Sequence, residues 1–245
     1  QQEADLAILN AEDDTQKGLA ASIRSQVVLF SSKRSLSPGI FVGEKTIVFS
    51  RPDGTEEHYP LSMISLPGLH NVENVMAALI LARFCGCERG AVIEAVSTFG
   101  GLPHRIEFAG EKNGVKFYDD SKGTNVDAVA RALQTFSAPV ILLLGGRDKN
   151  LPWEKLAEHV RSRVRHVILF GEAAELISSA LGSVQPNQTL QSISRCASLQ
   201  EAVQKAAELA QDGDSVLLSP GGTSYDAFKD FEERGECFRQ WVNAL

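Results

Sequence analysis

Short apolar runs alternate with helical patterns through the second half of the chain, and this alternation restricts the fold more than any other feature. The apolar runs cover residues 115–118, 140–144, 167–170 and 215–218, and the helical patterns cover residues 126–133, 153–160, 173–180 and 199–210. Such alternation is typical of an α/β fold in which helices cover a mostly parallel sheet. Ligands of these sheets bind beyond the carboxyl ends of the strands, so we expect functional residues in the loops that follow them.

The first half of the chain has a different pattern. Strand candidates at 26–30, 40–42 and 46–49 are separated by turns that contain Ser, Pro and Gly, which predicts antiparallel strands on the flank of a larger sheet. Helices are expected after them at 72–84 and 90–99.

The segment Gly100-Gly101-Leu102-Pro103 interrupts both patterns and predicts a domain boundary, with one domain at 1–101 and a second at 102–245. Residues 5–10 have the pattern of a strand inside a domain, and the first residue is Gln1 rather than Met. We therefore expect the chain to be a piece of a longer protein.

Composition excludes several classes of function. A hydrophobic share of 43% is enough to build a conventional core, and a net charge of −7 without a long basic run argues against a nucleic-acid surface. The apolar stretch at 139–144 is too short to span a bilayer, and the start has no signal-peptide pattern, which predicts a cytoplasmic protein. The spacing of Cys85, Cys87, Cys196 and Cys237 is not that of a zinc site, so no metal site is predicted.

The most informative loop is Tyr118-Asp119-Asp120-Ser121-Lys122-Gly123-Thr124-Asn125, which joins a strand to a helix. Thr124 or Asn125 can cap that helix, whose unpaired N–H groups and dipole favour an anion. Lys122 adds a full positive charge. The alternative is an ordinary capped loop with solvated charges.

Two more loops after predicted strands carry polar groups. Paired glycines in Gly145-Gly146-Arg147-Asp148-Lys149 let the backbone approach a ligand, although a glycine turn with surface charges remains open. The loop Ser219-Pro220-Gly221-Gly222-Thr223-Ser224-Tyr225-Asp226 enters a helix that is expected to carry Phe228, Phe231 and Phe238. It is either an anion-binding turn or a capping loop.

The first half ends with two further clusters. Asn71 and Asn74, three residues apart after Gly68-Leu69-His70, share a helix face that suits recognition of a base edge, with helix capping as the alternative for Asn71. In Leu102-Pro103-His104-Arg105 the guanidinium can reach a phosphate, or it is simply solvated.

Taken together in their order along the chain, from Gly68 onward, these five segments and Phe231-Glu232-x-Arg234-Gly235 resemble the Mur ligase family, in particular its D-glutamate-adding branch. The resemblance covers nearly the whole chain. Relatives that add other residues typically carry an Asp-Tyr-Ala-His type segment in place of Asp120-Ser121-Lys122. The resemblance implies the remainder of a central ATP-binding (ATPase) domain followed by a Rossmann-like, mostly parallel domain that binds the amino acid.

The resemblance also implies a reaction. ATP, with Mg²⁺, phosphorylates the carboxylate of UDP-N-acetylmuramoyl-L-alanine, and the amine of D-glutamate attacks the acyl phosphate to form an amide with loss of phosphate. This reaction belongs to the synthesis of peptidoglycan precursors. All partners are small molecules, with no nucleic acid or membrane, and the intact enzyme is expected to be a monomer.

Roles for individual residues follow from the same resemblance. The residues expected to bind ATP are Asn71, Asn74, Arg105, Asp120 and Lys122, of which Arg105 and Lys122 are also the catalytic candidates. The residues expected to bind the substrates are Thr124, Lys149, Ser224, Tyr225 and Phe231. His70 and His104 match motif positions without an assigned role.

The chain also departs from the family pattern. It contains no Gly-x-x-x-x-Gly-Lys-Ser/Thr loop, which in the family grips the ATP phosphates, and it lacks the UDP-binding domain and the segment with a carbamylated lysine. We therefore expect this polypeptide alone to be inactive. Two alternatives remain: a stand-alone module that binds a nucleotide or an acidic amino acid, and a ligase like folylpolyglutamate synthase, which the Lys122 loop disfavours.

Overall fold

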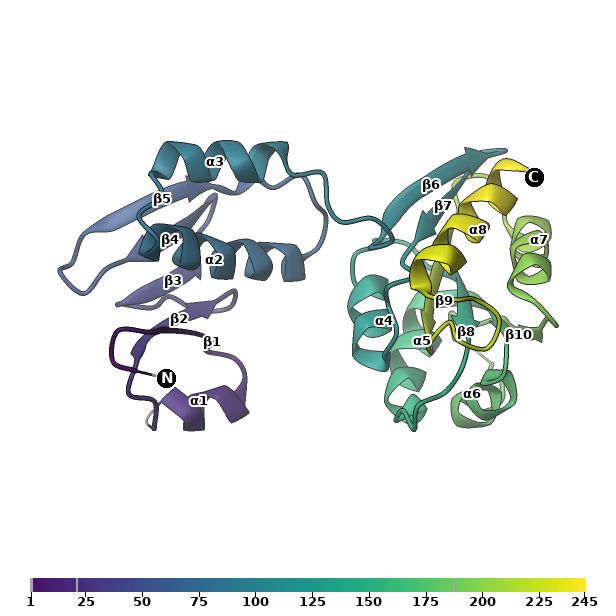
Figure 1. The fold of residues 1–245 in the computed structure, drawn as a ribbon. Coiled ribbons are helices and arrows are strands. Elements are labelled where there is room, and N and C mark those ends of the chain that lie inside the picture. Colours follow the sequence, from purple (N-terminus) through teal and green to yellow (C-terminus); the bar gives the residue numbers. More distant parts are fainter. Residues whose placement is uncertain (1, 21, 187) are drawn as a thin grey trace. The chain divides into compact units, whose positions relative to one another are not determined.

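The computed structural model describes residues 2–20, 22–186 and 188–245, and these form two compact units. Unit 1 covers residues 1–100 and unit 2 covers residues 101–245 (Figure 1). The division falls inside the Gly100 to Pro103 break. Among the described residues, every helix is too short or too polar to cross a membrane.

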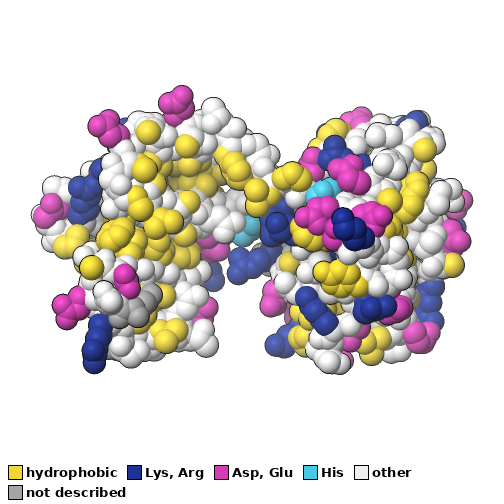
Figure 2. Space-filling view, viewed as in Figure 1, with side chains coloured by type: hydrophobic (Ala, Val, Ile, Leu, Met, Phe, Trp, Pro, Cys, Tyr) yellow, Lys and Arg dark blue, Asp and Glu magenta, His cyan; other side chains and the backbone are white. Residues whose placement is uncertain are grey.

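Unit 1 is a five-stranded sheet in the order β1-β2-β3-β4-β5. Its elements are β1 (Leu6–Asn10), α1 (Asp14–Ala20), β2 (Gln26–Ser31), β3 (Gly39–Val42), β4 (Thr46–Ser50), β5 (Glu56–Pro60), α2 (Leu69–Phe84) and α3 (Arg89–Thr98). Its core joins Ile40 and Ile47 of the sheet to Met76 and Leu79 of α2. Figure 2 shows hydrophobic side chains gathered on one face of unit 1. Separately, Leu81 and Phe84 of α2 are exposed hydrophobic residues.

The prediction of antiparallel strands in the first half is correct for the pairing of β3 with β4 and wrong for the pairing of β2 with β3. These two strands are parallel, as are β1 and β2. Only Phe30 with Ile40 and Ser31 with Phe41 are paired between β2 and β3. Because β3 begins beside the last residues of β2 and continues beyond them, a short loop is enough for a parallel connection.

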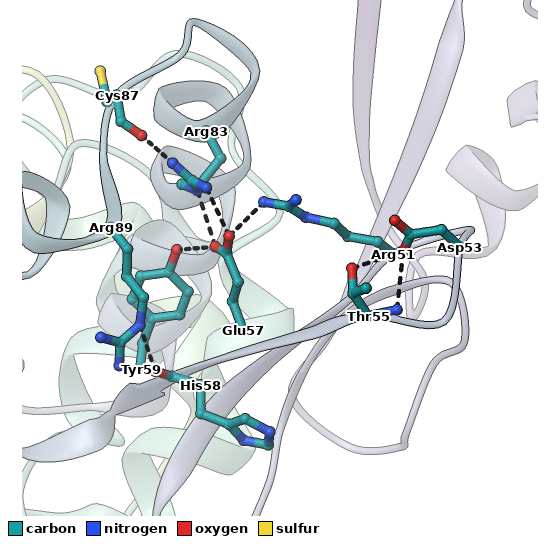
Figure 3. Close-up of polar contacts among 9 residues, drawn as sticks. All are labelled: Arg51, Asp53, Thr55, Glu57, His58, Tyr59, Arg83, Cys87 and Arg89. Atoms are coloured by element: carbon teal, nitrogen blue, oxygen red, sulfur yellow. Dashed lines mark hydrogen bonds and ion pairs between the residues drawn. The ribbon is translucent and has the colours of Figure 1, made fainter.

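A polar cluster ties β5 to α2 in unit 1 (Figure 3). The Glu57 carboxylate accepts hydrogen bonds from Nε and Nη2 of Arg83 at 2.9 and 2.6 Å, and also from Arg51 and the buried Tyr59 hydroxyl. The Arg89 guanidinium lies 5.3 Å from the centre of the Tyr59 ring. A cavity of about 1160 Å³ beside this cluster includes Arg51 and Arg83 in its lining, and none of the predicted site residues.

Unit 2 is a six-stranded sheet in the order β10-β9-β8-β11-β7-β6, parallel except for β6. Its strands are β6 (Glu107–Lys112), β7 (Val115–Asp119), β8 (Val140–Gly145), β9 (Val164–Phe170), β10 (Ser192–Arg195) and β11 (Ser215–Gly221). Its helices are α4 (Val126–Leu133), α5 (Ala157–Arg163), α6 (Ala174–Leu181), α7 (Leu199–Leu209) and α8 (Phe231–Asn243). The mostly parallel α/β architecture that the alternating pattern predicts is confirmed.

Helices cover both faces of this sheet (Figure 1), and each set of helices forms an apolar layer with it. Val129, Val160 and Ile177 of α4, α5 and α6 pack on one face, and Val203 of α7 and Phe238 of α8 pack on the other. All six residues of β8 are buried. A central strand covered on both faces needs apolar side chains at every position, which explains its unbroken apolar run.

Candidate functional site

Three loops meet at the carboxyl edge of the unit 2 sheet. The strands β7, β11 and β8 are parallel neighbours, so the chain leaves each of them at the same edge. The Gly221 N–H donates to the Gly123 carbonyl at 2.8 Å, and Arg147 and Thr223 exchange two backbone hydrogen bonds of 2.9 Å. We call these segments the aspartate loop (119–125), the glycine loop (145–151) and the serine loop (219–230).

Buried groups hold the aspartate loop in place. Asp120 is 2% exposed, and the Ser219 hydroxyl donates to its Oδ2 at 2.7 Å. Of the two predicted caps, Asn125 is the one used, because its side chain accepts from the Ala128 N–H at the start of α4. Thr124, the residue before it, is half-buried.

The pKa of Asp120 is raised to about 7, mainly by burial and to a smaller extent by the neighbouring Asp119. The Ser219 hydrogen bond and the charge of Arg105 act in the opposite direction. A carboxylate that has been removed from water in this way gains from a new hydrogen-bond donor or cation. Asp120 is therefore suited to accept hydrogen bonds from the hydroxyl groups of a ligand.

Replacing Asp120 by Asn is expected to stabilise unit 2 at about pH 8 and much less at about pH 4.5. The folded-state pKa of about 7 lies above the unfolded value of roughly 3.9. Between these two pKa values the folded state binds more protons than the unfolded state. The stability that protonated Asp120 contributes is therefore lost as pH rises toward about 7. Asparagine still accepts from Ser219 but does not ionise. Urea unfolding at both pH values, followed by fluorescence of Trp153 and Trp241 in unit 2, measures the difference. An equal effect at both pH values would contradict the expectation.

The two catalytic candidates lie on adjoining segments of unit 2. The Lys122 ammonium lies 5.2 Å from the centre of the Phe231 ring, which holds it by a cation–π contact. The Lys122 backbone N–H donates to the carbonyl of His104 at 3.1 Å, next to the exposed Arg105. The structure thus joins the segment of Arg105 to the loop of Asp120 and Lys122.

Arg234 of α8 links the aspartate and serine loops. It is fully buried, and its guanidinium donates to the Ser121 hydroxyl at 2.9 Å, to the Ser121 carbonyl at 2.8 Å and to the Gly222 carbonyl at 3.2 Å. Burial lowers the pKa of Arg234 to about 10, against the charges of Asp226, Asp119 and Asp120. At neutral pH the group is a buried cation that fixes the two loops to one helix.

The glycine loop is fixed by Asp148. This carboxylate accepts from the backbone N–H groups of Asn150 and Leu151 at 2.9 and 3.2 Å, and from the Trp153 indole at 2.8 Å. Lys149, the predicted substrate contact, is exposed between these anchored positions. Asp148 therefore shapes the loop, and the lysine is the group that remains available to a ligand.

The serine loop is longer than predicted. The helix expected to carry Phe228 begins only at Phe231, where Asp230 caps it by accepting from the Glu233 N–H at 2.8 Å. Phe228 therefore lies in the loop, because the capping carboxylate fixes the start of the helix after it. Ser224 is buried, whereas Tyr225 is 63% exposed.

The predicted adenine contacts lie in unit 1, on the first turns of α2. The Asn71 amide donates to the Pro67 carbonyl at 2.7 Å, which ties its side chain to the segment before the helix rather than to the N–H groups at the start of α2. Asn74 is exposed one turn later.

Two features of unit 2 were missed from the sequence: the buried role of Arg234 and the pairing of His104 with Asp119. For Arg234 a signal was present, because it shares the buried face of α8 with Gly235, Phe238 and Val242. An arginine on the apolar face of a helix indicates a buried hydrogen-bonding role. The His104 pairing has no comparable signal, because His104 lies in a loop and Asp119 ends β7, fifteen positions further along the chain.

Comparisons with known proteins come from both sequence and fold. Residues 104–222 match the family described as Mur ligase, glutamate ligase domain. Over 241 residues the chain is 47% identical to the UDP-N-acetylmuramoylalanine–D-glutamate ligase of Syntrophus aciditrophicus, a match that covers 98% of this chain and 52% of the relative. An enzyme of the same name from Geotalea uraniireducens is 41% identical over 245 residues, or 100% of this chain and 52% of the relative.

The fold comparison reaches more distant proteins. A pseudomurein peptide ligase type C from Methanothermus fervidus matches with a TM-score of 0.71 and 16% identity, over 97% of this chain and 56% of that one. This likeness concerns the fold alone. The chain spans about half the length of the curated relatives it matches.

Proposed function

This chain belongs to the Mur ligase family, and we propose that it forms part of an ATP-dependent enzyme that adds D-glutamate to UDP-N-acetylmuramoyl-L-alanine during peptidoglycan precursor synthesis. The observation that carries the proposal is that relatives with this activity in their names match along nearly the whole chain. The meeting of three polar loops at one sheet edge supports it. Nucleotide substrates favour a cytoplasmic location for the intact enzyme, and we propose that it acts as a monomer.

Cations of unit 2 suit the activation of a carboxylate by phosphoryl transfer, which depends on positioning and charge stabilisation. ATP supplies the phosphoryl group. The Lys122 ammonium and the exposed Arg105 guanidinium offer positive charge to the transferred group and the substrate carboxylate. The buried Asp120 accepts hydrogen bonds from the ribose hydroxyls. We propose that Asn71 and Asn74 of unit 1 are the residues that contact the adenine.

The second substrate is an amino acid with two carboxylates, and the other predicted residues suit it. Lys149 opposes one carboxylate charge, while the hydroxyls of Thr124 and Ser224 donate hydrogen bonds. Phe231 forms the pocket wall, and the exposed Tyr225 extends over the substrate from the serine loop.

Within the described part of the chain, His104, Glu107 and Asp119 are a cluster of three possible metal ligands, and this cluster does not suit Mg²⁺. Its atoms are already bonded to one another: His104 Nδ1 to Asp119 at 2.7 Å and the His104 N–H to Glu107 at 2.9 Å. Mg²⁺ requires oxygen ligands and water in octahedral geometry, which this cluster does not offer.

The experiment is a phosphate-release assay with ATP and UDP-N-acetylmuramoyl-L-alanine, using the full-length protein that the gene encodes. D-Glutamate is expected to support turnover, whereas L-glutamate and a diamino acid are not. Turnover that prefers either of the other amino acids, or none that depends on D-glutamate, would overturn the proposal. Residues 1–245 alone are expected to release no phosphate.

A further inference from the structure

His104 and Asp119 form a buried pair beside the candidate phosphate site. They are 5% and 0% exposed, and Nδ1 of His104 lies 2.7 Å from Oδ2 of Asp119. The other Asp119 oxygen accepts from the Ser121 N–H at 2.8 Å. Burial raises the pKa of Asp119, and the hydrogen bond from His104 acts against that rise. Both carboxylate oxygens are thus satisfied within the protein.

The backbone around His104 is held in an unfavourable conformation. His104 has a φ of 60° and Ile106 a φ of 50°, and Arg105 lies between them. A left-handed conformation is a clear outlier for a β-branched residue such as isoleucine, and it is energetically unfavourable. It persists only where the surroundings enforce it. Here the Glu107 carboxylate accepts from the His104 N–H at 2.9 Å, and the His104 carbonyl accepts from the Lys122 N–H at 3.1 Å.

Helix α8 closes over the pair. A Cβ at Gly235 would lie 2.2 Å from Nδ1 of His104 and 2.7 Å from Oδ2 of Asp119. Helix α8 therefore approaches the pair more closely than a residue with a side chain at position 235 would allow. The Phe231 ring meets the imidazole edge to face, with 6.2 Å between ring centres. The pair therefore has no room to move away from β7.

We propose that His104, held by Asp119, is a positioning residue that fixes Arg105 relative to Lys122. This inference rests on the proposed function, in which these two cations face the same phosphoryl group. The pair anchors the residue before Arg105 to the end of β7, and the His104 carbonyl ties the same residue to the backbone of Lys122. Without the imidazole, the segment relaxes toward ordinary φ values and turns the guanidinium away.

The test compares variants of the full-length enzyme in steady-state assays. His104→Ala is expected to lower kcat/KM for ATP by roughly 10- to 100-fold, because small misplacements of positioning groups cost that much. The KM for D-glutamate should change little. His104→Asn should stay within about threefold of wild type, since its amide reaches Asp119 and asparagine tolerates positive φ. If His104 acts through Arg105, adding His104→Ala to Arg105→Ala causes no further loss.

A matched control separates positioning from general damage. His166 also uses Nδ1, in a 2.8 Å hydrogen bond to Ser192 between β9 and β10, so His166→Ala should leave kcat/KM unchanged. Additive losses in the double variant, or a His104→Asn enzyme as impaired as His104→Ala, would overturn the inference. Hydrogen exchange of segments 103–108 and 120–124 is independent of activity and should be faster in His104→Ala. If exchange is faster in His104→Ala but the wild-type enzyme does not ligate D-glutamate, only the proposed function is overturned. If exchange of these segments is the same in His104→Ala and wild type, the inference about His104 is overturned.

Discussion

Replacing Lys122 by alanine is expected to lower the rate of D-glutamate addition by about 10²- to 10³-fold, the loss typical of removing one preorganised charge from a transition state. The Lys122 ammonium is held above the Phe231 ring, and the Lys122 backbone N–H is bonded to the His104 carbonyl. The charge is therefore in place before the substrates bind. Stabilisation that requires no rearrangement is the kind that accelerates phosphoryl transfer. Phosphate release that depends on D-glutamate measures the loss in the full-length enzyme.

Lys116→Ala provides the control for Lys122→Ala. This lysine is exposed on β7, the strand that leads into the aspartate loop, and its removal changes the net charge equally. It should leave the rate within about twofold, because isolated surface charges contribute little. A Lys122→Ala enzyme that keeps more than about a tenth of the wild-type rate would contradict the role given to the ammonium.

Arg234→Met is expected to lower the free energy of unfolding of unit 2 by about 3 kcal/mol. Methionine fills similar space but leaves the carbonyls of Ser121 and Gly222 buried without the donor they now share. Unsatisfied buried acceptors cost about 1–3 kcal/mol each. Urea unfolding followed by tryptophan fluorescence reports this unit alone, because Trp153 and Trp241 are the two tryptophans of the chain.

Arg239→Met on the same helix is the matched control. Arg239 is paired with Glu107 at the surface and is about one-third exposed, so its loss should cost less than about 1 kcal/mol. If the two variants were equally stable, the loop carbonyls would have found other partners, and the role of Arg234 as a link between loops would be wrong.

The alternating pattern was sufficient to predict the sheet of unit 2 because its central strands are buried on both faces. The segment 140–144 reads as an unbroken apolar run, and β8 is buried at every position. Three strands were missed for the opposite reason. β5, β6 and β10 carry polar side chains at partly exposed positions, so neither apolar alternation nor a continuous run marks them.

The sequence also predicted that the polar loops lie at one edge of the sheet, because parallel strands all end at the same edge. Asp120, Lys122, Lys149 and Ser224 were selected in this way, and their loops are joined by backbone hydrogen bonds. Their individual roles remain predictions. The parallel pairing of β2 and β3 could not be read, because it depends on a two-residue overlap rather than on side-chain pattern.

The sequence by itself determined the mostly parallel sheet, the position of its polar loops and the family, since strand burial and loop composition are local properties. The tertiary structure decided how those loops are held. Arg234 reaches Ser121 across 113 positions, and His104 meets Asp119 only where α8 has a glycine to admit them. Contacts of this kind depend on the distance between surfaces that the rest of the fold brings together, and no local pattern of residues encodes that distance.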